Sequence, residues 1–322
     1  MTGIEDAALL AVVAIGSALG ASALPRASWP RRCPAAAILL WQALGLASGL
    51  AAVGTLIGLA LPASQGGLVL SVLRAAGQLR NGDGFGLARL FGLGEADAVP
   101  LVLVAVRLAC LAAGLVLLAS LCWVLIAASA AALQARRRQR ALLALLAHGD
   151  PKVPGALVVD YPTVAAYCLP GLFSRIVVLS VGTVELLGRG ELAAVLAHER
   201  AHLRERHDLV LLPFTALRRA FPRSAMCAEA HRSVALLVEM LADDRALRAR
   251  PARELVSALV RVGTAGQVSV GTLAAAGSDS EVTARVNRLL LPRHPLPAPA
   301  VAGICLGSAL LAVAPAALMF LS

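Results

Sequence analysis

Four long apolar runs constrain this chain more than any other feature of its sequence. Each run reaches or exceeds the roughly 18–20 residues that a helix needs to cross the hydrocarbon core of a bilayer. The composition agrees, because 59% apolar and 15% charged residues make the chain too apolar for a soluble globular protein. The sequence therefore predicts a mostly α membrane protein with four transmembrane helices, at about Ala7–Leu24, Ala36–Leu61, Leu101–Ala132 and Ala300–Leu321.

The charged residues beside these runs predict how the helices are oriented. The first run follows Glu5 and Asp6 rather than the positive flank of a signal peptide, so we expect it to remain as an anchor. Arginine-rich segments follow the first and third runs, and the positive-inside rule places such segments in the cytoplasm. We therefore expect a multi-pass protein of the plasma membrane with its N-terminus outside. The arginines concerned are Arg26, Arg31, Arg32 and those of the tract Ala135–Arg140.

The charge and the cysteines argue against two classes of function. The net charge of +10 could attract nucleic acid, but much of it lies in arginines that flank the membrane, and no nucleic-acid-binding motif accompanies it. Direct nucleic-acid binding is therefore not expected, and the anionic lipid of the bilayer is the simpler partner. The six cysteines form no CxxC pair, so neither a disulfide framework nor a cysteine zinc site is indicated.

The segment between the third and fourth runs has the composition of a soluble domain. It is more charged than the runs, holds all six histidines and is long enough to bury a core of its own. The predicted domains are a three-helix anchor at residues 1–134, a cytoplasmic α+β domain at residues 135–299 and a fourth transmembrane helix at residues 300–322.

Within the cytoplasmic domain, the residue pattern predicts two strands and several helices. β-Branched and apolar stretches bounded by turn residues predict strands at Ala156–Tyr161 and Arg175–Ser180. Thr183 is the expected cap of a short helix that follows the second strand. Longer helices are predicted near Glu191–His207, Ser233–Ala249 and Pro251–Val262.

The first of these longer helices carries a metal-binding pattern. His198 and His202 are four residues apart, so both imidazoles project from one face and can bind a single ion. Glu199 lies beside them, where its carboxylate can reach a water on the metal. This is the HExxH arrangement of zinc peptidases, although its three residues occur by accident in about one chain in a hundred of this size. A third protein ligand should follow.

The stretch "VEMLADDRAL" supplies a candidate for that ligand. Glu239 and Asp243 are again four residues apart on a predicted helix, which permits a metal ligand and a hydrogen-bond acceptor on one face. An acidic pair taken alone is more often the solvated face of a helix. Its place a few dozen residues after HExxH favours the metal site, with Glu239 as the third zinc ligand and Asp243 fixing the ring of His198.

The remaining histidines have simpler interpretations. His148 and His294 are expected at the surface of the domain. His207 and Asp208 follow the HExxH motif closely, and we interpret them first as a helix cap. A role beside the metal ligands is the alternative for these two residues.

Together these segments resemble the BlaR/MecR-type membrane metallopeptidases, the antirepressor family of β-lactam sensing. The resemblance covers the four spans, the insert between the third and fourth, and the segments "ELAAVLAHERAHLRERHD", "EMLADDRA" and, more weakly, "ARVNRLL". "AAYCLPG" at 165–171 is similar to the "NAFxxPG" stretch of the related HtpX-like and CAAX prenyl-protein peptidases, with Ala165 in place of the asparagine. Antirepressors carry an extracellular penicillin-binding sensor after the last span, whereas this sequence ends at Ser322, so we do not expect direct β-lactam sensing.

The resemblance implies a gluzincin-type domain with one Zn²⁺ per chain. In that family a substrate peptide adds by backbone pairing to an edge strand above the metal, which we place at Arg175–Ser180. The candidate substrate-contacting residues are therefore Tyr167, Arg175, Ile176, Val177 and Val178. Three alternatives remain for the residue that stabilises the oxyanion, namely Tyr167, His231 and Arg245.

The predicted activity is zinc-dependent hydrolysis of a peptide bond. Glu199 would act as general base towards a water that the zinc ion activates, and would then pass the proton to the leaving amine. The predicted partner is a cytosolic or membrane-proximal protein substrate, and the resemblance makes a transcriptional repressor one candidate. Two alternatives stay open, an HtpX-like quality-control peptidase and a non-catalytic membrane sensor or scaffold.

Overall fold

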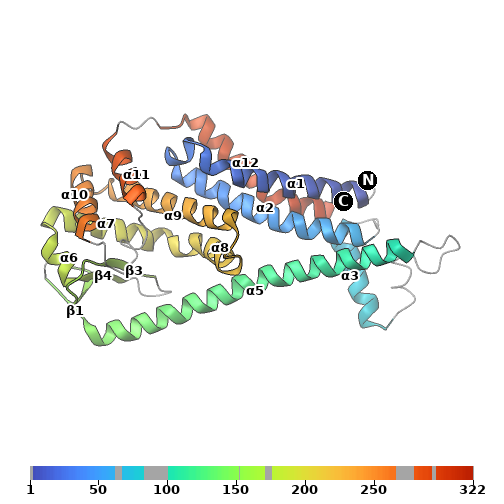
Figure 1. The fold of residues 1–322 in the computed structure, drawn as a ribbon, viewed down its shortest axis with the longest axis horizontal. Helices are drawn as coiled ribbons and strands as arrows, with labels where there is room; N and C mark the ends of the chain where they lie inside the picture. The colour runs from blue at the N-terminus through green and yellow to red at the C-terminus, as the bar shows by residue number, and fades with distance from the viewer. Residues whose placement is uncertain are drawn as a thin grey trace. The chain divides into compact units, whose positions relative to one another are not determined.

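The computed structural model describes residues 3–61, 67–82, 101–151, 153–170, 176–265, 279–291 and 295–321 (Figure 1). Most of these residues are helical. The chain divides into two compact units. The first combines Met1–Ala27, Leu39–Val124 and Pro297–Ser322, and the second combines Ser28–Ile38 with Leu125–Leu296.

Four helices among the described residues are long and apolar enough to cross a membrane, as the sequence predicts. Such helices suggest a membrane protein, while the direction in which they cross stays a prediction. A shorter helix, α3 (Gly67–Arg80), packs against the last of them and was not expected, because its 14 residues are too few for a membrane-spanning run. The four long helices are α1 (Gly3–Ala23), α2 (Pro34–Ala60), α5 (Leu101–Leu146) and α12 (Ala298–Leu321).

Helix α5 continues well beyond its apolar part. It extends for 46 residues to Leu146, through the tract Ala135–Arg140 and past the domain boundary predicted at residue 134. The last turns contain alanine, leucine, arginine and glutamine, which are all strong helix formers, and no glycine or proline interrupts them. The part of α5 from Leu125 onward belongs to the second unit, where Leu143 packs on a sheet.

The second unit contains a four-stranded sheet in the order β1-β2-β4-β3. β2 (Ala156–Val159) and β4 (Ile176–Ser180) pair in parallel, which confirms that both predicted stretches form strands. β1 (Ala147–Gly149) adds antiparallel to β2, and β3 (Ala166–Leu169) adds antiparallel to β4. Neither β1 nor β3 was predicted, because three or four residues show too little alternation to be recognised as a strand.

The expectation that residues 175–180 form the edge strand is wrong. β4 lies between β2 and β3, so its backbone is paired on both sides, and β3 ends the described sheet on this side. Arg175 lies outside the described residues. The sequence of β4 is apolar at almost every position, which is typical of a strand buried on both faces rather than of an edge.

The two faces of the sheet pack against different helices (Figure 1). Val177 and Leu179 of β4 lie in the core with α7 (Arg189–Glu205). Val178 lies on the opposite face with Leu143 of α5, and its register partner Tyr167 shares that face. The sheet is therefore a middle layer between the end of α5 and α7.

Ser180, and not Thr183, caps the short helix α6 (Val181–Leu186). The side-chain oxygen of Ser180 accepts a hydrogen bond from the Thr183 backbone N–H at 3.2 Å. Thr183 is instead fully buried within the helix, and its hydroxyl donates to the carbonyl of Ala165 at 2.8 Å. The predicted cap was one turn too late because serine and threonine cap helices about equally well and both stand at this junction.

Helices form the rest of the described second unit, and α7 packs against both α9 and α10. Helix α9 begins well before the predicted Ser233, because the side chain of Ser224 caps it by accepting a hydrogen bond from the backbone N–H of Cys227. The helices that follow α7 are α8 (His207–Ala220), α9 (Ala225–Ala246), α10 (Ala252–Ala265) and α11 (Asp279–Leu290).

A short segment from far upstream also belongs to the second unit. The second of two 3-10 turns between α1 and α2, Trp29–Arg31, packs against α9. The Nε atom of Arg288 on α11 donates to the carbonyl of Arg31 at 2.7 Å, and Nη2 of Arg32 donates to the carbonyl of Pro295 at 3.5 Å. The described fold of this unit therefore includes part of the segment that joins the first two apolar helices.

Gly182 permits a close approach between α6 and the segment before β3. A Cβ atom at this position would lie 2.0 Å from the carbonyl oxygen of Pro162, which is backbone and cannot rotate away. We expect Gly182→Ala to lower the free energy of unfolding by about 1–3 kcal/mol, as overpacking does. Gly149→Ala is the matched control, because a Cβ atom there would meet nothing within 4 Å. Thermal unfolding in detergent measures both variants, and equal stability would contradict the expectation.

Candidate metal centre

Helix α7 brings three side chains of the HExxH motif into the interior. His198 and Glu199 are 1% and 2% exposed, and the one-turn spacing places His202 beside His198. The Nε2 atoms of the two histidines are 3.0 Å apart. Helix α7 ends about one turn after His202, where Arg206 adopts a left-handed conformation with φ of 53°.

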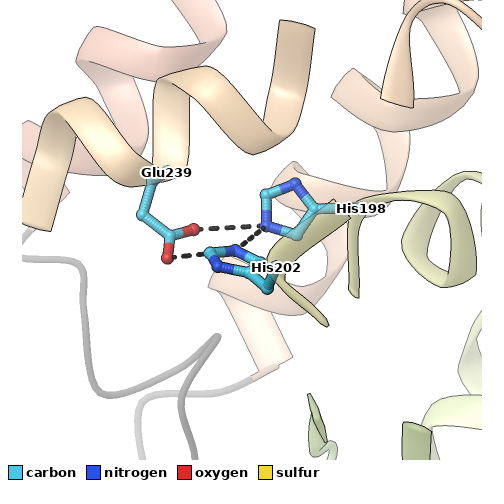
Figure 2. A group of neighbouring side chains, drawn as sticks. All are labelled: His198, His202 and Glu239. Carbon is cyan, nitrogen blue, oxygen red and sulfur yellow. Dashed lines mark hydrogen bonds and ion pairs between the residues drawn. The ribbon is translucent and has the colours of Figure 1, made fainter. Parts of the chain in front are cut away.

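Helix α9 supplies the carboxylate that completes the group. Figure 2 shows Glu239 reaching from its own helix towards both imidazole rings. Its Oε2 atom lies 3.3 Å from Nε2 of His198, and its Oε1 atom lies 3.5 Å from Nε2 of His202. The structure thus brings together the three residues that the sequence proposed as metal ligands.

The donors of this group fit a divalent metal ion. One ligand atom from each of His198, His202 and Glu239 lies within 4.8 Å of the others. Two imidazole nitrogens and one carboxylate oxygen are a donor set that zinc uses in catalytic sites, where a fourth position stays open for water. The lone pairs of two Nε2 atoms that face each other repel unless a proton or a cation lies between them.

Asp243 lies where a partner for the outer nitrogen of a metal-binding histidine is needed. Its Oδ1 atom is 3.0 Å from Nδ1 of His198, and its side chain is 1% exposed. Such a carboxylate fixes the tautomer of the ring, so that Nε2 is directed towards the metal. The spacing of Glu239 and Asp243 in the sequence predicted this pairing.

His207 lies beside a metal ligand, which was the alternative to the helix cap first expected for it. It is not a cap, because Arg206 occupies the N-cap position of α8. Instead, His207 is 2% exposed, and its Nδ1 atom lies 2.9 Å from Nδ1 of His202. Glu205 lies on its other side, with Oε2 3.6 Å from Nε2 of His207. The outer nitrogen of His202 therefore has its own buried partner, as that of His198 does.

Two further residues at the centre were missed. Arg285 of α11 forms ion pairs with both Glu239 and Asp243. Cys168 of β3 faces Glu199, and burial together with the charge of Glu199 raises the pKa of its thiol. No sequence pattern marked Cys168, because the four residues of β3 show too little alternation to be recognised as a strand. For Arg285 the weak resemblance of "ARVNRLL" was the only signal.

The predicted substrate and oxyanion residues are not gathered at the metal group. Val177 and Val178 are 2% and 1% exposed in an interior strand, so β4 does not offer Ile176–Val178 to a peptide. Tyr167 lies on the sheet face that packs on α5, away from α7. Arg245 forms an ion pair with Glu205. His231 lies about two turns before Glu239 on α9 and stays a candidate.

Burial and nearby charges set the protonation of the group. Burial raises the pKa of Glu199 to about 7, and the charge of Glu239 adds to this shift against the opposing effect of His198. Burial lowers the pKa of His202 to about 3. Burial also lowers the pKa of His198, but hydrogen bonds and charges from Asp243 and Glu239 outweigh burial and raise this pKa to about 9. A carboxyl with a pKa near 7 suits a general base.

These pKa values predict that metal binding releases a proton from His198. With a pKa of about 9, the ring is protonated at neutral pH in the metal-free protein and must lose that proton before it can act as a ligand. Lower pH favours the protonated ring, so the affinity for zinc should fall about tenfold for each pH unit between pH 8 and pH 6. Calorimetric titration in buffers of different ionisation enthalpy measures the released proton. An affinity that does not change with pH would contradict this assignment.

Comparison with known proteins agrees with this geometry. The model of peptidase family M48 matches residues 128–289, which is half of the chain and includes His198, Glu199, His202 and Glu239. No curated protein and no solved structure matches the chain. Members of the matched family are typically zinc-dependent, which fits the His-His-Glu group. By its sequence, the chain therefore belongs to peptidase family M48.

Proposed function

We propose that this protein is a membrane-anchored zinc endopeptidase. The observation that carries the proposal is the buried group of His198, His202 and Glu239, whose ligand atoms lie within 4.8 Å of one another beside the carboxyl of Glu199. A surface cluster of acidic and imidazole groups would not need the buried partners that Asp243 and His207 provide. A non-catalytic scaffold has no need of this arrangement.

Each residue of the centre has a role in peptide hydrolysis. His198, His202 and Glu239 would hold the zinc ion, with Asp243 and His207 orienting the two rings. When bound, zinc supplies the Lewis acidity that activates a water near neutral pH and polarises the substrate carbonyl. Glu199 accepts the proton of the attacking water and returns it to the leaving amine, for which its pKa of about 7 is suitable.

The substrate peptide is proposed to add to β3 rather than to β4. β3 pairs with β4 on one side and is the last strand of the described sheet, so its other edge can accept an extended peptide. It also packs against α7, and its Cys168 side chain faces Glu199. A peptide paired along this edge would present its backbone near the general base.

We infer the nature of the substrate from the resemblance to BlaR/MecR-type peptidases and from the four apolar helices. The four apolar helices suggest that substrates are membrane-proximal proteins, and the arginine-rich segments favour the cytoplasmic side of the plasma membrane. The resemblance to BlaR/MecR-type peptidases favours a transcriptional repressor. Cleavage of unfolded membrane proteins in place of a repressor would instead identify a quality-control enzyme of the HtpX-like kind.

Glu199→Gln should separate metal binding from catalysis. The amide keeps the size of the side chain but cannot accept the proton, so cleavage of fluorogenic casein by the detergent-purified protein should fall by about 10²–10⁴-fold. Bound zinc, measured by atomic absorption, should remain at the wild-type level, since Glu199 is not a ligand.

The exposed residue Glu185 on the neighbouring helix α6 provides the control for this variant. Glu185→Gln makes the same chemical change away from the centre and should leave both cleavage and zinc unchanged. Full activity in Glu199→Gln would exclude the proposed mechanism. A wild-type protein that binds no zinc would exclude the metal centre itself.

A further inference from the structure

We propose that Arg285 is the positioning residue of the metal centre, holding Glu239 against the two imidazole rings and holding Asp243 against His198. This inference rests on the proposed zinc site and adds a residue from a third helix, α11, to a centre otherwise built by α7 and α9. Arg285 acts through the two carboxylates, and it is not assigned a part in the chemistry.

One guanidinium group binds both carboxylates. Arg285 binds Asp243 in a bidentate contact. Its Nε donates to Oδ2 at 2.9 Å, and its Nη2 donates to Oδ1 at 2.7 Å. Nη1 of the same group lies 2.9 Å from Oε2 of Glu239. The side chain of Arg285 is 5% exposed, so these contacts form with little competition from water.

Two of the carboxylate oxygens that Arg285 binds also face the ring of His198. Oε2 of Glu239 lies 2.9 Å from Nη1 of Arg285 and 3.3 Å from Nε2 of His198, while Oε1 lies 3.5 Å from Nε2 of His202. Oδ1 of Asp243 receives Nη2 of Arg285 and lies 3.0 Å from Nδ1 of His198. Because the guanidinium group is planar, it fixes the orientation of both carboxylates at once.

The charge of Arg285 alone would have the opposite effect on metal affinity. A cation beside the ligands repels a divalent ion, so its removal should tighten zinc binding if electrostatic repulsion were its only influence. If Arg285 instead orients the ligands, its removal should weaken zinc binding, as the loss of partners behind metal ligands generally does. The sign of the change in affinity therefore distinguishes the two roles.

The same helix contains a matched control. Arg288 lies one turn after Arg285 on α11 and also makes a bidentate contact, with Asp244. Its Nη1 donates to Oδ1 at 2.9 Å, and its Nη2 donates to Oδ2 at 2.7 Å. Asp244 directly follows Asp243 on α9, and the other contacts of Arg288 are with the backbone carbonyls of Met240 and Arg31. Loss of Arg288 should weaken the packing of α11 without altering the ligands.

The test compares three variants of the full-length protein in detergent: Arg285→Met, Arg285→Lys and Arg288→Met. Zinc affinity is measured by competition with a fluorescent chelator, thermal unfolding records stability, and the visible absorption of the Co²⁺-loaded protein reports the geometry of the ligands. We expect Arg285→Met to lower zinc affinity by about 10–100-fold and to change the Co²⁺ spectrum. Arg288→Met should lower the unfolding temperature but keep zinc affinity within about twofold and the spectrum unchanged.

Arg285→Lys keeps the charge but loses the planar fork, so it should fold and still show a changed Co²⁺ spectrum. This variant carries the test if Arg285→Met does not fold. Unchanged or tighter zinc binding in Arg285→Met, or an equal loss in Arg288→Met, would overturn the positioning role while leaving the zinc peptidase intact. Absence of zinc binding in the wild type would instead overturn the proposed function, and the role of Arg285 with it.

Discussion

Two buried imidazole nitrogens that face each other at 3.0 Å determine much of the second unit. Such a pair needs a proton or a cation between the rings, and the carboxylates beside it need partners of their own, because uncompensated buried charge is costly. Glu239, Asp243 and His207 supply these partners, and Arg285 compensates the carboxylates. The packing of α7 against α9, together with Arg285 from α11, therefore brings together charged groups that stabilise one another.

The local parts of the site could be predicted from the sequence. The four-residue spacing of His198 and His202 requires one face of a helix, and the same spacing in Glu239 and Asp243 suggested a second helix of matching chemistry. The four apolar helices could also be recognised from the sequence, because a helix that can span a membrane needs only length and hydrophobicity. In each case the signal is contained within a single element of secondary structure.

The parts that could not be predicted depend on contacts between distant segments. The composition of β4 indicated a strand, but its interior position depends on pairing with β2 and β3, which no local pattern encodes. Arg285 is 42 residues from Asp243 and lies on a helix whose other arginine, Arg288, looks equivalent in sequence. His207 was first interpreted as a cap because its position beside His202 depends on the left-handed conformation of Arg206, which the sequence does not indicate.

The contact of Arg31 with Arg288 means that the second unit is not formed by one contiguous stretch of the chain. The two residues are separated by 257 positions, so the 3-10 turn emerges from the ribosome long before the helix that it meets. A fragment cut at the start of α5 would leave the flank of α9 bare and deprive Arg288 of a backbone acceptor. Shortened versions for crystallisation would therefore need this turn, either grafted by a linker or retained by circular permutation.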